Sequence, residues 1–135
     1  MAGMTAQPRR RVVVGVDTHK HVHVAVALDQ VGAQLTEGFF SADRAGYRDL
    51  IAWASGLGDQ LTFAIEGTGS YGAGLTSAVR RSGTGVVEVM RADRRDRKLR
   101  GKSDTLDAEN AARAELAGQA KAVPKSADGI VEMLR

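Results

Sequence analysis

The sequence predicts an α/β domain built on a mixed five-stranded sheet with helices on its faces. Two observations lead to this prediction. Three strand-like segments come first, and helical and strand-like segments then alternate, which gives the order β-β-β-α-β-α-β-α. Strands joined by short turns pair as an antiparallel meander, whereas strands joined through a helix pair in parallel, with the helices covering the sheet.

The first three segments are predicted to be strands on two different grounds. Residues 11–17 (RVVVGVD) form a continuous β-branched run, which is typical of a strand buried on both faces. Over 21–28, valine and leucine alternate with histidine and alanine, which is the period of a strand. A turn at 29–32 then leads into a third strand over 33–40.

The elements that follow alternate between helix and strand. Ser41 or Asp43 is the expected N-cap of the first helix, which Gly56 and Gly58 end. Residues 61–66 (LTFAIE) are then expected to form the fourth strand.

The second half of the chain continues this alternation. A helix is expected through 75–81, where Gly83 ends it, and 86–90 are predicted to form the fifth strand. The last helix is expected to begin near Ser103 or Asp104 and to run through an alanine-rich segment. This element order is that of the ribonuclease-H-like fold.

We expect one folded domain. It covers residues 11–118, with the last helix ending at about Gly118, and a basic tail over 1–10 precedes it. Residues 119–135 are expected to be a linker or the start of a missing C-terminal region. A chain of 135 residues is long enough to bury a core of this kind.

Composition excludes several classes of protein. The chain has 43% hydrophobic and 26% charged residues, which is ordinary globular usage. It has no cysteine, so disulfides and thiolate metal sites are excluded, and a reducing cytoplasm is the expected location. No apolar run approaches the length of a membrane span, and no membrane partner is expected.

Positive charge is concentrated immediately before the last helix. The net charge is only +3, but the segment 91–102 is a cluster of arginine and lysine residues. The only acidic residues in it are Asp93 and Asp96. Such runs are often solvated loops, and here the position favours contacts to a phosphate backbone. Lys102 is the best single candidate. The expected nucleic-acid contacts are Arg94, Arg95, Arg97, Lys98, Arg100 and Lys102.

Four carboxylates fall where this fold could bring them together. Asp17 ends the first strand and Glu66 ends the fourth, so the two meet at one sheet edge if those strands are adjacent and parallel. Asp104 and Asp107 are three residues apart on a helix and share one face. Crowded carboxylates repel one another unless a cation lies between them.

Hard oxygen ligands select Mg²⁺ or Mn²⁺, and a pair of such ions about 3.5–4 Å apart is the arrangement used for phosphodiester chemistry. We therefore expect Asp17, Glu66, Asp104 and Asp107 to be catalytic residues that ligate metal, with two ions as the expected number. Each residue also has a structural interpretation. Asp17 could start a turn, Glu66 could be a surface strand end, and Asp104 could cap the helix with Asp107 in a capping box.

Three motifs carry a resemblance to a known family. The segments VGVDTHK, AIEGTGSYG and KSDTLDAENAA resemble the DEDD transposases of the insertion-sequence family numbered one hundred and ten. The resemblance covers about residues 11–118. It implies a RuvC-like nuclease domain whose acidic residues match Asp17, Glu66, Asp104 and Asp107, acting on DNA during transposition.

The resemblance also implies partners. The family has a C-terminal domain with a serine that attacks DNA, and it works with a structured guide RNA. We expect such a guide and a homo-oligomer here. The sequence stops before any serine-bearing domain, so we expect a fragment or truncated copy whose activity alone is in doubt.

Other signals are weaker. Gly67, Gly69 and Gly72 spell a dinucleotide-binding motif, which we reject because Glu66 would face the pyrophosphate. The same glycines suit a tight turn from strand to helix. Tyr71 could stack on a nucleotide or be packed.

The histidines His19, His21 and His23 alternate along the chain, and on one strand they would share a face able to bind a transition metal. A half-exposed strand face is the interpretation we favour. His19 and Lys20 could also contact phosphate.

The predicted function is therefore metal-dependent DNA cleavage or strand exchange. Two alternatives remain at the level of sequence. One is an actin-like ATP-binding domain, although the Asp17-Thr18-His19-Lys20 segment lacks the glycine that such a domain needs. The other is a non-catalytic nucleic-acid-binding or assembly module in which the acidic residues serve as caps.

Overall fold

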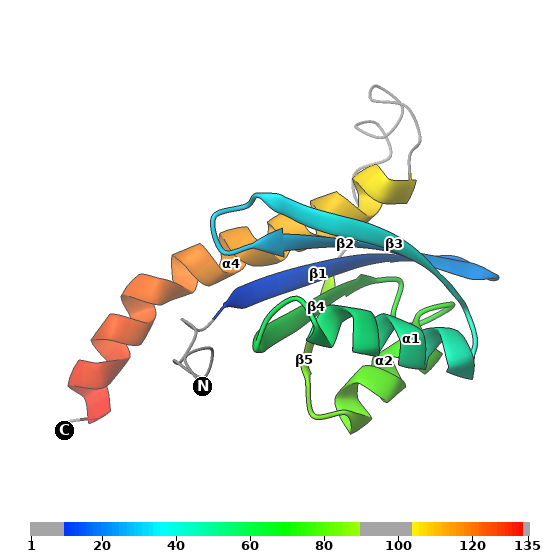
Figure 1. Ribbon diagram of the computed structural model, residues 1–135. Coiled ribbons are helices and arrows are strands. Elements are labelled where there is room, and N and C mark those ends of the chain that lie inside the picture. The colour runs from blue at the N-terminus through cyan, green and yellow to red at the C-terminus, as the bar shows by residue number, and fades with distance from the viewer. Residues whose placement is uncertain (1–9, 90–103, 134–135) are drawn as a thin grey trace, which may run out of the picture.

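A computed structural model describes residues 10–89 and 104–133 of the chain, with side chains through residue 119 in the last helix. Five strands form one sheet in the order β3-β2-β1-β4-β5. This arrangement confirms the predicted mixed α/β sheet (Figure 1). The strands are β1 (Arg11–Thr18), β2 (Val22–Asp29), β3 (Gln34–Ser41), β4 (Gln60–Glu66) and β5 (Gly85–Val89).

The pairing follows from the connections. β1 pairs with β2 and β2 with β3 in antiparallel fashion, because short turns join them. β4 pairs in parallel with both β1 and β5, because helices provide the crossovers. β1 therefore lies at the centre of the sheet, between an antiparallel and a parallel neighbour.

Helices cover both faces of the sheet. On one face lie α1 (Arg44–Ser55) and α2 (Ala73–Arg81), and on the other lies the long helix α4 (Asp104–Met133) (Figure 1). Residues alternate between the two faces along a strand. Even-numbered residues of β1 accordingly pack with Leu50 and Leu75 of α1 and α2, and Val13 packs with the alanines of α4. The continuous apolar run of β1 is thus buried on both faces, as predicted.

The contact between α4 and the sheet is made by small residues. Ala108, Ala111 and Ala112 are buried against the sheet. A Cβ atom added to Gly15 in the middle of β1 would collide with the carbonyl oxygen of Ala108 and would lie 2.6 Å from the amide nitrogen of Ala112. The helix backbone therefore approaches the central strand more closely than any larger side chain would permit.

The start of α1 settles the choice between two predicted caps. Asp43 is the N-cap, and its Oδ1 accepts a hydrogen bond of 2.8 Å from the amide of Gly46. Ser41 supports the cap, since its hydroxyl donates to the same oxygen at 2.8 Å. This use of an aspartate satisfies one of the amide groups left without a partner at a helix start.

The end of the last helix differs from the prediction. The expected end near Gly118 was wrong, because α4 continues to Met133 through much of the segment expected to be a linker. A glycine inside an exposed helix costs only about 1 kcal/mol relative to alanine, which is too little to end a helix by itself. The division of the chain into tail, domain and linker stays a prediction. In the part of the chain that the structure describes, no helix has the length and apolar character to cross a membrane.

Candidate metal centre

Two buried carboxylates meet at the ends of the paired strands β1 and β4. Asp17 and Glu66 are partners in the parallel register, and they are only 2% and 4% exposed. Asp17 lies four residues after Val13 on β1, Glu66 lies two residues after Ala64 on β4, and both Val13 and Ala64 pack in the cluster under α4. Because side chains two residues apart point to the same face, both carboxylates lie on the α4 face of the sheet. The predicted meeting of the two strand ends is confirmed.

Helix α4 brings the other two carboxylates to the same edge. It begins at Asp104, whose side chain is 52% exposed, and it buries Asp107 to 4% exposure one turn later. Both carboxylates are near enough to Asp17 to raise the pKa of its carboxyl group. The close packing of α4 on Gly15 sets this proximity, because it fixes the height of the helix start above the end of β1.

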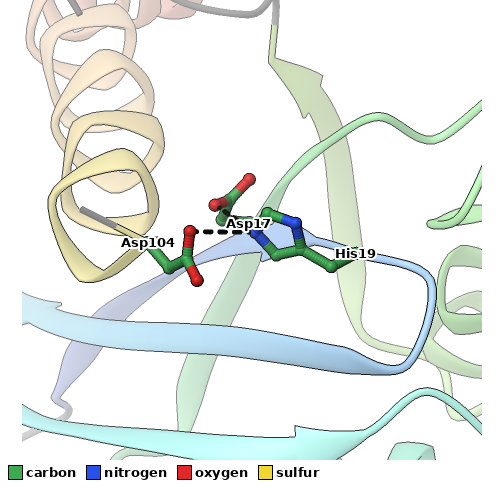
Figure 2. A group of neighbouring side chains, drawn as sticks. All are labelled: Asp17, His19 and Asp104. Carbon is green, nitrogen blue, oxygen red and sulfur yellow. Dashed lines mark hydrogen bonds and ion pairs between the residues drawn. The ribbon is translucent and has the colours of Figure 1, made fainter. Parts of the chain in front are cut away.

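His19 connects the sheet carboxylate to the helix carboxylate. Its Nε2 atom lies 2.8 Å from Oδ2 of Asp17 and 3.2 Å from Oδ1 of Asp104 (Figure 2). One ligand atom from each of these three residues lies within 4.8 Å of the others. From the sequence, His19 was a candidate phosphate contact or a member of a histidine strand face that could bind a transition metal. The turn between β1 and β2 instead directs its ring back toward the end of β1.

The electrostatics of Asp17 indicate what kind of ligand this cluster would bind. Burial raises the pKa of this carboxyl group above its usual value, the contact with His19 lowers it, and the charges of Asp107 and Asp104 raise it again. A divalent cation between these groups would offset both the burial and the repulsion, and carboxylates are the ligands that Mg²⁺ and Mn²⁺ prefer. The donor set therefore fits such an ion.

Thr18 is a site residue that the sequence analysis missed. Its hydroxyl donates a 2.7 Å hydrogen bond to the carbonyl oxygen of Glu66, and the threonine is buried. This bond ties the end of β1 to the end of β4 directly beside the two carboxylates. A threonine that follows an aspartate at a strand end was the available signal.

The three histidines of this region do not share one face. His23 is fully buried in β2 and stacks on Tyr47 of α1, with ring centroids 5.8 Å apart. His21 is exposed in the turn and His19 points to the acidic cluster. The expected half-exposed histidine face was therefore wrong, because the turn separates His19 and His21 from the strand that carries His23.

The glycine-rich turn after β4 shapes the edge of the site. Gly67 adopts a positive φ of 82°, which favours glycine, and the amide of Gly72 donates to its carbonyl oxygen at 2.9 Å. These contacts support the interpretation of the glycines as a tight turn. Tyr71 is 54% exposed in this turn, so it is not a packed residue.

Two further observations bound the site. The predicted nucleic-acid contacts Arg94, Arg95, Arg97, Lys98, Arg100 and Lys102 lie outside the described residues, and their role stays a prediction. A hollow of about 550 Å³ lies between α1 and α2 and has none of the four carboxylates in its lining. We place the candidate site at the acidic cluster, because the carboxylates whose mutual repulsion a cation would offset are there.

Comparison with known proteins gives the family and the fold of the chain. A family model for transposases of the DEDD type matches residues 14–135. Among solved structures, the chain is similar to RuvC of Thermus thermophilus, with 12% sequence identity and a TM-score of 0.50 over 75% of this chain and 90% of that chain. At this identity the likeness shows the fold alone, and it confirms the RuvC-like class predicted from the sequence. A search of curated proteins found no match.

Two Pelota proteins show a lower similarity. That of Archaeoglobus fulgidus has 15% identity and a TM-score of 0.42 over 93% of this chain and 40% of that chain. That of Thermoplasma acidophilum has 14% identity and a TM-score of 0.42 over 90% of this chain and 44% of that chain. No argument rests on these two similarities.

Proposed function

This chain belongs to the DEDD transposase family, the insertion-sequence family numbered one hundred and ten, and on that basis we propose that its acidic cluster is a metal-dependent catalytic centre for DNA cleavage or strand exchange. The ligands in this proposal are Asp17, Glu66, Asp104 and Asp107. The observation that carries it is the placement of two buried strand-end carboxylates on the sheet face where α4 supplies two more.

The four residues have different places and therefore different roles. The charges of both Asp107 and Asp104 act on Asp17, so it would hold an ion together with the helix carboxylates. Glu66 and Asp107 are buried and would hold an ion from the sheet side and the helix side. Asp104 is half exposed, so it is the carboxylate that incoming DNA would approach first.

Bound Mg²⁺ or Mn²⁺, as a pair, would supply activation of the attacking oxygen and stabilisation of the leaving oxygen. The protein contributes rigidity to this arrangement. Thr18 fastens β1 to β4 beside the carboxylates, and the packing of α4 on Gly15 fixes the third element. A scaffold that holds its ligands in place is needed because the productive geometry tolerates displacements of only about 0.5 Å.

DNA is the substrate in this proposal. Membership of the family suggests further partners, which are proposed with it. The basic segment 91–102 precedes α4 in the chain and would hold a phosphate backbone near the metals. A structured guide RNA, a serine-bearing domain and self-association complete the proposed machinery.

Metal binding by the 135-residue chain tests this proposal. Asp17→Asn and Glu66→Gln keep the size of each side chain but remove its charge. We expect Mg²⁺ or Mn²⁺ to stabilise the wild-type chain by about 2.7 kcal/mol at a concentration one hundred times its dissociation constant. Each variant should lose this stabilisation, and Asp17→Asn should be more stable than wild type without metal because it relieves the repulsion.

The control is Asp49→Asn on the exposed face of α1, which should leave metal-dependent stabilisation unchanged. In the transposase assembled with its partners, Asp17→Asn should abolish DNA cleavage with the fold intact. Stabilisation by metal that survives both Asp17→Asn and Glu66→Gln would rule out this centre.

A further inference from the structure

We propose that His19 is a fifth member of this metal centre, binding the ion through Nε2, and that its nitrogen makes the centre prefer Mn²⁺ to Mg²⁺. The inference rests on the proposed metal-dependent function and adds to it a ligand outside the four carboxylates. It is carried by the position of the imidazole between Asp17 and Asp104 (Figure 2).

The distances around Nε2 are those of a shared coordination sphere. A six-coordinate ion with bonds of about 2.1 Å separates neighbouring ligand atoms by about 3.0 Å, the edge of an octahedron. Nε2 lies 2.8 Å from Oδ2 of Asp17 and 3.2 Å from Oδ1 of Asp104, on either side of that value. One ion could therefore contact all three atoms with only small side-chain movements.

A hydrogen-bonding role explains the same geometry less fully. Nε2 carries at most one hydrogen, so it cannot donate a well-directed bond to both carboxylates at once. An ion bound by all three atoms has no such restriction. The three residues come from the end of β1, the turn after it and the start of α4, and one ion at this position would join these segments.

The backbone of His19 is held in place for this role. Its amide hydrogen points to the carbonyl oxygen of Val22 at 3.2 Å and to Nδ1 of the buried His23 at 3.4 Å. These contacts fix the turn and limit the positions open to the His19 ring. A ligand held in position before binding loses less conformational entropy when the ion arrives.

Ligand chemistry gives the preference between metals. Carboxylates suit Mg²⁺ and Mn²⁺ alike, whereas imidazole nitrogen suits transition metals. Replacing one oxygen donor by nitrogen therefore favours Mn²⁺ at this position. We expect His19→Ala to weaken Mn²⁺ binding by about tenfold or more, and to weaken Mg²⁺ binding less, so that the preference for Mn²⁺ narrows.

Pulsed electron paramagnetic resonance of the Mn²⁺-loaded 135-residue chain tests the inference directly. Histidine nitrogen bound to Mn²⁺ gives a coupling that changes when the protein is labelled with ¹⁵N-histidine. We expect this coupling in the wild type and its loss in His19→Ala. His21→Ala is the matched control, because His21 is an exposed histidine of the same turn. Calorimetric titration with each metal measures the change in preference.

The outcomes separate this inference from the function on which it rests. Mn²⁺ binding that needs Asp17 but shows no histidine coupling would overturn the role of His19 and leave the carboxylate centre standing. Coupling that persists in His19→Ala would overturn it as well. Failure of the wild type to bind either metal would remove both proposals.

Discussion

Asp17 is the residue at which burial and repulsion act in the same direction. Both raise the pKa of its carboxyl group, and only the contact with His19 opposes them. The ionised form of this carboxylate is therefore unfavourable unless a cation lies beside it. Such conflicts are concentrated at functional sites, where a ligand absent from the free protein resolves them.

Asp43 shows the opposite case, in which a charged carboxylate stabilises local structure. Its hydrogen bonds from the amide of Gly46 and the hydroxyl of Ser41 hold the pKa of its carboxyl group below the usual range. Because the folded pKa is depressed, the unfolded chain takes up a proton first as the pH falls. The stabilisation is therefore full above the unfolded pKa, about 3.9 for aspartate, and is lost as the pH falls through the folded value.

We accordingly expect the wild type to be more stable than Asp43→Asn near neutral pH, with the difference shrinking below about pH 4. Asparagine is an equally good cap, so the variant isolates the charge. Thermal unfolding over a pH series measures the difference. Ser41→Ala removes one hydrogen-bond donor to the Asp43 carboxylate, so the difference in stability should depend less on pH in that background. A difference that stays constant down to pH 2 would contradict this account.

Among the elements, α4 decides whether the site is complete. Its alanines and Gly15 allow two backbones to approach each other, so the helix carries its aspartates to the sheet edge at a fixed height. A packing surface made of small residues has little room for change, because interiors are packed as densely as organic crystals.

Gly15→Ala should therefore displace α4. The added methyl group meets backbone atoms of Ala108 and Ala112, which cannot rotate away. We expect a loss of about 1–3 kcal/mol in the free energy of unfolding, measured by denaturant titration, together with weaker metal-dependent stabilisation. Gly118→Ala is the control in the same helix. Nothing lies within 4 Å of its added methyl group, so it should stabilise the protein by about 0.5–1 kcal/mol. Unchanged stability in Gly15→Ala would show that the close contact is not rigid.

How much of the fold and of the candidate site could be predicted from the sequence depends on whether a regular pattern of residues determines the feature. The carboxylates of β1 and β4 could be predicted because strand periodicity and parallel pairing fix where strand ends meet. The position of His19 beside Asp17 and Asp104 could not, because a turn that folds a ring back onto its own strand leaves no periodic pattern. The extent of α4 was underestimated for a related reason, since Gly118 looks like a helix end when only local propensity is considered.

At the scale of the whole molecule, the acidic cluster contrasts with the positively charged segment 91–102, which precedes α4 in the chain. We expect duplex DNA binding to depend on this segment and to weaken steeply with salt, with a log–log slope of about 0.9 for each neutralised phosphate. Reversing Arg94, Arg95, Arg97 and Lys98 to glutamate should abolish binding measured by fluorescence anisotropy.

A second set of reversals controls for net charge. Changing Arg44, Arg48, Arg80 and Arg81 to glutamate alters the total charge equally, but these exposed residues lie on α1 and α2, across the sheet from α4. This variant should retain most of the affinity. Equal losses in the two variants would mean that DNA senses the overall charge and not the segment.

The distribution of the four carboxylates along the chain also has a consequence in time. Asp17 leaves the ribosome early and Glu66 later, whereas Asp104 and Asp107 follow only after most of the domain has been made. At about 5–20 residues per second, the first and last of these groups are separated by on the order of ten seconds of synthesis. During that interval the nascent sheet can form, but its proposed metal centre lacks half of its carboxylates. The proposed catalytic centre would thus stay incomplete, and unable to act on DNA, until the final helix had docked on the sheet.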